Sequence, residues 1–298
     1  MSLLPVIALA ASLGGTAPQE INTTQDVTRI EDVQVSAALR EEQVRSQVSS
    51  FISNNIAPPP GRPLARWNTP VCIATAYLNP QYGQAIIDRI ATRIIEFGGD
   101  VEGEGCQVNL MVVGTNDGAA TAKALVADNL LGFMPSSSAT NHTKRSLREF
   151  QTSADPVRWW HVSLPVMLDS QEIAVRLKGE EAPMVWPTFD ASRLRSNTRD
   201  DLMRVVIIID FTKVENIQMG ALVDYISFVA MTQVSANHEA TGYQSVLNLF
   251  NDPQNVTGLT QWDRDYLTAL YRTSPNRPNI RHQVADLATE VIIEREGR

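Results

Sequence analysis

The fold is decided between residues 71 and 113, which read VCIATAYLNPQYGQAIIDRIATRIIEFGGDVEGEGCQVNLMVV. Residues 71–78 are rich in β-branched and aromatic side chains, and this composition predicts a strand. Asn79 is a natural N-cap, and Pro80 suits the first position of the helix that follows. Isoleucines then recur on one helical face, and residues 108–113 predict a second strand. A strand, a helix and a strand joined so closely predict a right-handed parallel βαβ unit.

The chain has two cysteines, Cys72 and Cys106, placed near the starts of these two strands. Neighbouring parallel strands would bring the two Cα atoms near the roughly 5–6 Å that a disulfide needs. Their spacing is not that of a C-x-x-C motif, so it predicts neither a redox site nor a c-type haem site. We expect an intramolecular disulfide, and the alternative is two buried free thiols.

The rest of the chain alternates between helical and extended patterns. We expect a helix at 119–132, a polar loop at 134–146, a β-hairpin from 157–168 and 172–175, a central strand at 205–209, a buried helix at 219–234, a helix opened by a capping box at Thr260, and a last helix at 281–294. The expected fold class is α/β (α+β), with a mixed sheet that contains the parallel βαβ unit and is packed against helices.

The N-terminal region predicts export. Residues 1–17 contain an apolar run from Leu3 to Leu13 and small residues near its end, which is the pattern of a signal peptide, although no Lys or Arg precedes the run. The alternative is an uncleaved apolar N-terminus. We expect residues 18–60 to form a tail and an amphipathic helix at 36–56, and residues 61–298 to form a single α/β domain.

Composition narrows the classes of partner. The chain has 298 residues, 43% of them hydrophobic and 19% charged, which is typical of a globular protein. The net charge of −8 and the lack of a Lys/Arg cluster argue against nucleic acid as a partner. A protein partner is possible, and no small-molecule ligand can be assigned.

Motifs that carry chemistry are missing from the sequence. We find neither a phosphate loop nor a G-x-S-x-G elbow, and the four histidines are scattered without partners at helical spacing. We therefore predict no catalytic residue, no cofactor-binding residue and no metal ligand. Trp159-Trp160-His161 could form a stacking platform for a ligand, but alternation along a strand favours one Trp in the core and the other over an edge or a hairpin partner.

Several stretches resemble a family of exported alphaproteobacterial proteins. They are residues 51–52 with 57–59, then 64–72, 157–163, 245–250 and 259–267. The resemblance covers residues 36–272 and implies kinship without assigning an activity.

The order of the expected elements also resembles, more distantly, the zincin metalloprotease fold, matrixin-like in its order. Zinc binding there needs two His one helical turn apart, with a Glu beside the first. The helix at 219–234 places Asp224 and Phe228 at the two His positions and Tyr225 at the Glu. The third ligand position falls on Val234. The resemblance therefore implies a degenerate zincin-like domain that binds no metal.

Three functions remain open at this point. The leading hypothesis is a non-catalytic exported envelope protein, periplasmic or envelope-associated, that serves as a scaffold or binding module. The second is a hydrolase whose active site assembles from residues far apart in the sequence. The third is an accessory subunit of an envelope complex that docks through the helix at 36–56.

Overall fold

The computed structural model describes residues 23–136, 142–181 and 195–297, with side chains described from residue 39 onward. The chain divides into two compact units, Met1–Glu42 and Gln43–Arg298. Helix α1 (Thr23–Asn55) contributes residues to both units, and within the second its apolar residues Val48, Phe51 and Ile52 are buried. The predicted signal peptide lies outside the described residues.

A four-stranded mixed sheet forms the centre of the second unit, as the sequence predicted. The strands are β1 (Ile73–Ala76), β2 (Leu110–Thr115), β3 (Val157–Met167) and β4 (Thr198–Asp210), and their order across the sheet is β1-β2-β4-β3. β1, β2 and β4 run parallel, whereas β3 runs antiparallel to β4. β3 is therefore an edge strand, and β4 is central and almost wholly buried at its C-terminal end.

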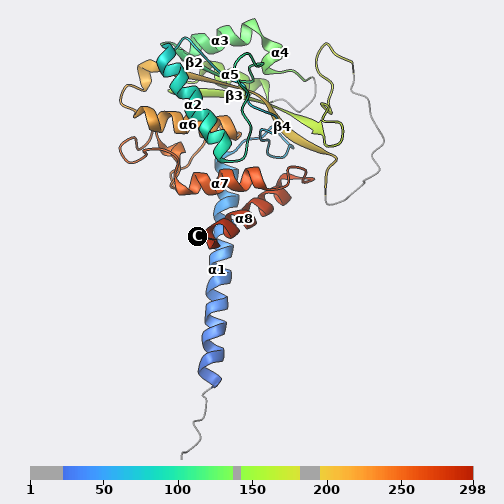
Figure 1. Ribbon diagram of the computed structural model, residues 1–298, viewed down its shortest axis with the longest axis vertical. Helices are drawn as coiled ribbons and strands as arrows, with labels where there is room; N and C mark the ends of the chain where they lie inside the picture. Colours follow the sequence, from blue (N-terminus) through green and yellow to red (C-terminus); the bar gives the residue numbers. More distant parts are fainter. Residues whose placement is uncertain (1–22, 137–141, 182–194, 298) are drawn as a thin grey trace, which may run out of the picture. The chain divides into compact units, whose positions relative to one another are not determined.

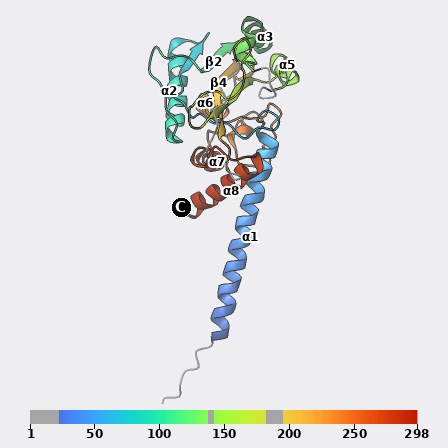
Figure 2. The same cartoon turned by 90° about the vertical axis from the view of Figure 1, so that its right-hand side faces the viewer.

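Helices cover both faces of the sheet (Figures 1 and 2). The helices after α1 are α2 (Pro80–Glu96), α3 (Gly118–Asp128), α4 (Leu130–Phe133), α5 (Lys144–Thr152), α6 (Met219–Met231), α7 (Gln261–Arg272) and α8 (Ile280–Glu296). The larger apolar core lies among the sheet, α2, α6, α7 and α8. A smaller core lies on the opposite face, under α3, α4 and α5. No described helix is both long and apolar enough to cross a membrane.

The disulfide is present as the sequence predicted. Cys72 and Cys106 are bonded, with their Cα atoms 5.9 Å apart. The parallel pairing of β1 with β2 explains the closeness, because Cys72 precedes β1 and its carbonyl accepts hydrogen bonds from the start of the second strand. A disulfide suggests an oxidising compartment outside the cytoplasm.

Several boundaries differ from those predicted. α1 begins at Thr23, so residues 23–34 are helical rather than a loose tail. β1 ends at Ala76 because Tyr77 adopts a left-handed backbone conformation, with φ of 57°. The helix predicted at 119–132 is split at Asn129, which ends α3 and caps α4.

The predicted hairpin is present but short: the N–H of Met167 donates to the carbonyl of Glu172, and the N–H of Ala174 donates to the carbonyl of Pro165. β3 pairs along its length with β4, and the segment that returns from it reaches β3 through a single bridge between Val166 and Ile173. The sequence pattern was right about the strand at 157–168 and about the segment that returns to it, but the longer pairing with β4 was not predicted, because pairing over a long sequence separation leaves no local signal.

Candidate functional site

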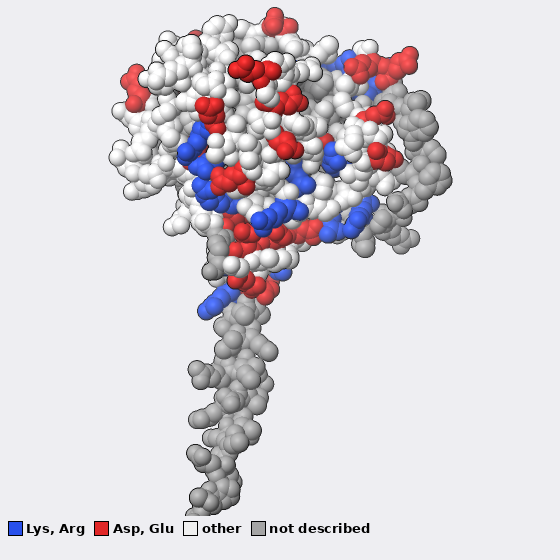
Figure 3. All heavy atoms as spheres, in the orientation of Figure 1, with Lys and Arg blue, Asp and Glu red and all other residues white. Residues whose placement is uncertain are grey.

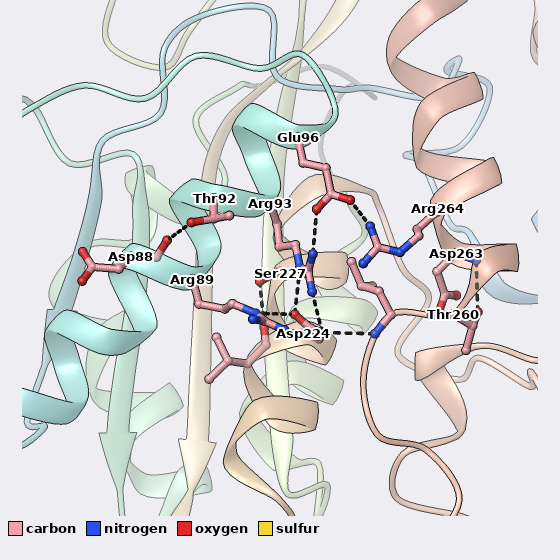
Figure 4. Close-up of polar contacts among 12 residues, drawn as sticks. Asp88, Arg89, Thr92, Arg93, Glu96, Asp224, Ser227, Thr260, Asp263 and Arg264 are labelled. Atoms are coloured by element: carbon pink, nitrogen blue, oxygen red, sulfur yellow. Dashed lines mark hydrogen bonds and ion pairs between the residues drawn. The ribbon is translucent and has the colours of Figure 1, made fainter.

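Asp224 lies on α6 at the first position of the predicted zincin register, and it is 2% exposed. Arg93 binds it with two parallel hydrogen bonds, Nε to Oδ1 and Nη2 to Oδ2, both 2.9 Å long. Arg89 binds the same two oxygens at 2.9 and 3.0 Å, and the backbone N–H of Leu259 donates to Oδ2 at 3.2 Å. Figure 4 shows both arginines reaching from α2 to this one carboxylate.

The carboxylate of Asp224 is held in its charged form. Burial alone would raise its pKa, but the hydrogen bonds from Arg89, Arg93 and the Leu259 N–H outweigh that effect and leave the pKa below its ordinary value. Gly258 approaches Oδ2 so closely that a Cβ at this position would lie 2.6 Å from it. Both oxygens of the Asp224 carboxylate therefore accept hydrogen bonds, and this side chain has a structural role.

The ion-pair network continues to the surface. Arg93 also binds Glu96 at 2.6 Å, and Glu96 binds Arg264 of α7. Figure 3 shows Lys and Arg side chains next to Asp and Glu side chains on the face drawn, rather than a patch of one sign. The network ties α2 to α6 and α7.

The residues at the other positions of the predicted zincin register contact different neighbours. Tyr225 packs edge-on against Trp159 and Phe250, and burial raises its pKa far above the ordinary value. Phe228 is buried against Tyr266 of α7.

Val234 lies beyond the end of α6. It pairs with Ile56 in an isolated bridge and accepts a hydrogen bond from the Trp159 indole. The structure thus does not bring Asp224, Tyr225, Phe228 and Val234 together in one site. Among the described residues no group of three or more His, Cys, Asp or Glu side chains is placed to hold a metal ion.

A different site lies at the first residues of β3. A cavity of about 340 Å³ opens beside residues 157–161, and the segment 234–237 after α6 forms one wall together with Ala57. α5 and the residues at its two ends form the other wall. The side chains on that wall are those of His142, Ser146, Glu149, Phe150, Thr152, Ser153 and Asp155.

The two tryptophans of β3 fix this part of the strand. Trp159 lies on the α6 face, where its indole Nε1 donates to the carbonyl of Val234 at 2.9 Å. Trp160 lies on the other face and donates to the carbonyl of Phe133 at 2.8 Å. Both rings are buried, so they anchor the cavity walls to the strand, and neither is an exposed stacking platform.

The backbone of β3 presents unpaired groups to the cavity. The N–H of Asp210 donates to the carbonyl of Pro156, so the backbone groups of Pro156 face β4. Because alternate residues of a strand face opposite edges, the N–H and C=O groups of Val157, Trp159 and His161 face the open edge. No residue in the described part of the chain pairs with those groups.

Further along β3 the same edge is covered. The N–H of Ala174 donates to the carbonyl of Pro165, and the N–H of Met167 donates to the carbonyl of Glu172, both at 2.8 Å. The open edge is thus limited to the beginning of the strand, at the cavity.

Two histidines that are 19 residues apart in the sequence line this cavity together. Burial lowers the pKa of His142 to about 4 and also lowers the pKa of His161 to about 4, so both imidazoles are neutral at neutral pH. The spacing of the four histidines in the sequence did not predict this pair. The two histidines lie at one cavity only because α5 packs beside β3, and the sequence carries no local pattern that indicates this packing.

Arg158 is the second ionisable residue that β3 contributes to the cavity, and it is buried. Its guanidinium lies at the C-terminal end of α5, where Nη1 is 3.5 Å from the carbonyl of Phe150 and Nη2 is 3.4 Å from the carbonyl of Asp155. Burial lowers the pKa of Arg158, and the nearby carboxylates of Asp155, Asp210 and Asp117 act in the opposite direction.

The comparisons with known proteins return nothing for this chain. No protein-family model matches it, and neither a curated protein nor a solved structure does.

Proposed function

We propose that this chain is a non-catalytic, exported binding module of the cell envelope, and that its open β3 edge binds an extended segment of a partner protein. The disulfide and the predicted signal peptide support export. The arginine clamp on Asp224 supports the non-catalytic part, because it occupies both carboxylate oxygens at a position where the resemblance to zincins would require a metal ligand. The degenerate zincin-like fold remains part of the proposal.

One observation carries the binding function. Val157, Trp159 and His161 are 2%, 9% and 4% exposed, yet their outward backbone groups have no partner in the described chain. Buried backbone N–H and C=O groups are almost always hydrogen-bonded, to protein or to water. An added strand satisfies all of them at once, which is how β-augmentation works in peptide-binding domains.

The cavity explains why the occupant is an extended polypeptide. An added strand alternates its side chains, one set toward the α5 wall and the other toward residues 234–237. The open edge is short, because the return segment at Ile173 covers β3 beyond it. Only a few residues can pair there, so the side chains that enter the cavity must supply much of the specificity.

A peptide selection tests the proposal. Peptides from a displayed random library would be selected on the purified full chain and then titrated while backbone amide exchange is followed. We expect slower exchange of the Trp159 and His161 amides when a selected peptide binds. Peptides that bind without protecting these two amides would overturn the proposal.

Proline substitution supplies matched variants. Val157→Pro removes an outward N–H without removing a bond to β4, and edge strands tolerate such a proline. Thr75→Pro does the same on the other edge of the sheet, in β1. We expect Val157→Pro to lose peptide binding and Thr75→Pro to retain it. Casein should stay intact with the unaltered protein, and its cleavage would favour the hydrolase hypothesis instead.

A further inference from the structure

His161 is held in one orientation at the end of the open edge, as the last of its three outward-facing residues. Its Nε2 lies 2.7 Å from the carbonyl oxygen of Val229 on α6. A carbonyl oxygen only accepts hydrogen bonds, so Nε2 carries the proton and donates it. Nδ1 is then the unprotonated nitrogen, with a lone pair that can only accept.

This lone pair has no partner among the described residues. No hydrogen bond joins Nδ1 to any group in the described chain, and His161 has no further interaction beyond those already given. Five buried side-chain polar atoms of the described chain are sealed without a partner, and Nδ1 of His161 is not one of them. Because His161 lines the cavity, Nδ1 retains access to that space.

The surroundings restrict what can meet this acceptor. A carboxylate or carbonyl oxygen would place a second lone pair against that of Nδ1. A cationic donor would find no carboxylate among the described residues on the face of β3 that carries His161, where the cavity is lined by Trp159 and residues 234–237. A neutral donor remains, and the Trp159 ring on the same face of β3, together with Val234 and Ala236, favours a donor carried on an apolar ring.

We infer that His161 is a specificity residue whose Nδ1 accepts a hydrogen bond from a neutral O–H group on an aromatic ring, as a tyrosine side chain of the bound segment would offer. This inference rests on the proposed function, because it names the side chain that the added strand places in the cavity. Burial keeps the imidazole neutral, with a pKa of about 4, so the acceptor persists at neutral pH. The groups that line the cavity around it are His142, Glu149, Asp155 and Arg158.

The test uses small probes that match the tyrosine side chain. The unaltered full chain, labelled with ¹⁵N, would be titrated with p-cresol and with 4-methylanisole, which has the same ring but a capped oxygen. We expect p-cresol to bind about threefold to tenfold more tightly, the range that one neutral hydrogen bond gives. We also expect p-cresol alone to move the ¹⁵N resonance of His161 Nδ1 upfield.

Substitutions separate the hydrogen bond from simple cavity filling. His161→Phe should bind both probes equally, whereas His282→Phe, an exposed control at the start of α8, should keep the preference for p-cresol. The resonance measurement needs only the unaltered protein, so it stands even where His161→Phe does not fold. Equal affinity for the two probes with an unmoved Nδ1 resonance would overturn the inference, and so would binding of neither probe.

The two proposals can fail separately. The peptide selection reports on the backbone amides of the β3 edge, whereas the ring probes report on His161 Nδ1. Probe binding with no edge protection would contradict strand addition while leaving the acceptor in place. Edge protection by peptides that contain no tyrosine, together with equal probe affinities, would uphold strand addition and reject the role of His161.

Discussion

Arg93 and Asp224 are joined by two parallel hydrogen bonds, both 2.9 Å long, across the interface between α2 and α6. The geometry matches a planar guanidinium to a planar carboxylate, which is the strongest arrangement available to such a pair. The Asp224 side chain is 3% exposed and that of Arg93 is 11% exposed, so water screens the pair only weakly. Four donor atoms from two arginines leave neither carboxylate oxygen free for other chemistry.

Removal of this carboxylate should destabilise the fold. Asp224→Ala removes the buried anion that Arg89 and Arg93 share, and among the described residues it leaves Arg93 paired only with Glu96. We expect the free energy of unfolding to fall by about 3 kcal/mol, as it does when one half of a buried pair is removed. Asp128→Asn, at the exposed end of α3, should change it by less than about 0.5 kcal/mol. Urea denaturation at neutral pH measures both. An Asp224→Ala protein as stable as the control would show that the clamp contributes little.

The same carboxylate predicts that the free energy of unfolding decreases as the pH falls. The pKa of Asp224 is depressed in the folded state, so its contribution is present above the unfolded pKa of about 4 and is lost as the pH falls through the folded value. Urea midpoints measured between pH 5 and pH 3 should therefore fall for the unaltered protein. They should fall less steeply for Asp224→Asn, which has no carboxyl group to titrate at this position.

The disulfide should contribute stability comparable to that of the clamp. Cys72 and Cys106 are separated by 34 residues in sequence, and a loop of that size is worth about 3–4 kcal/mol in the chain-entropy model. We expect Cys72→Ser with Cys106→Ser to lower the free energy of unfolding by about that amount without changing the β1–β2 pairing. Unreduced protein treated with an alkylating agent should take up no label. Two labelled thiols would contradict the bridge.

The parts of this fold that local chemistry determines could be predicted from the sequence. Asn79 caps α2 and Pro80 begins it, and Thr260 with Asp263 forms the capping box of α7, because these signals lie within a few residues of one another. The disulfide followed from the βαβ unit. The partner of β3 could not be predicted, because β4 begins 31 residues after β3 ends and their pairing depends on the whole sheet.

The candidate site likewise combines features that could be predicted from the sequence with features that could not. The residues 159–161 could be recognised as unusual in the sequence, and the alternation along β3 was predicted. The cavity wall opposite these residues could not be predicted. His142 reaches the cavity because α5 packs beside β3, and Val234 reaches it because the chain after α6 returns to bridge Ile56. Neither placement leaves a trace in spacing or composition.

His161 should make stability depend on pH in a range that begins above that of Asp224. Its folded pKa of about 4 lies below its ordinary value of 6.5, so the unfolded chain binds the proton more tightly. The contribution is present above about pH 6.5 and is lost as the pH falls toward 4, by roughly 3 kcal/mol in all.

Replacement of the imidazole tests this dependence. His161→Gln should flatten the loss of stability between pH 6.5 and pH 4, and a remaining slope should come from His142. His282→Gln, at the exposed start of α8, should keep the slope of the unaltered protein. An unchanged slope in His161→Gln would mean that His161 takes up its proton in the folded protein as easily as in the unfolded chain.

The open edge of β3 makes a prediction about the free protein. Arg158 and Trp160 alternate with Val157, Trp159 and His161, so their N–H groups donate to β4 while those of the other three face the cavity. An amide exchanges quickly when no acceptor within the protein protects it, even in a stable strand. We therefore expect the amides of Trp159 and His161 to exchange at least tenfold faster than those of Arg158 and Trp160 in native-state exchange followed by NMR. Met167 provides the internal comparison, because its N–H donates to the carbonyl of Glu172 in the return segment, and its amide should exchange slowly. Uniformly slow exchange along β3 would show that the edge is already satisfied within the free chain, and strand addition would then have no groups left to bind.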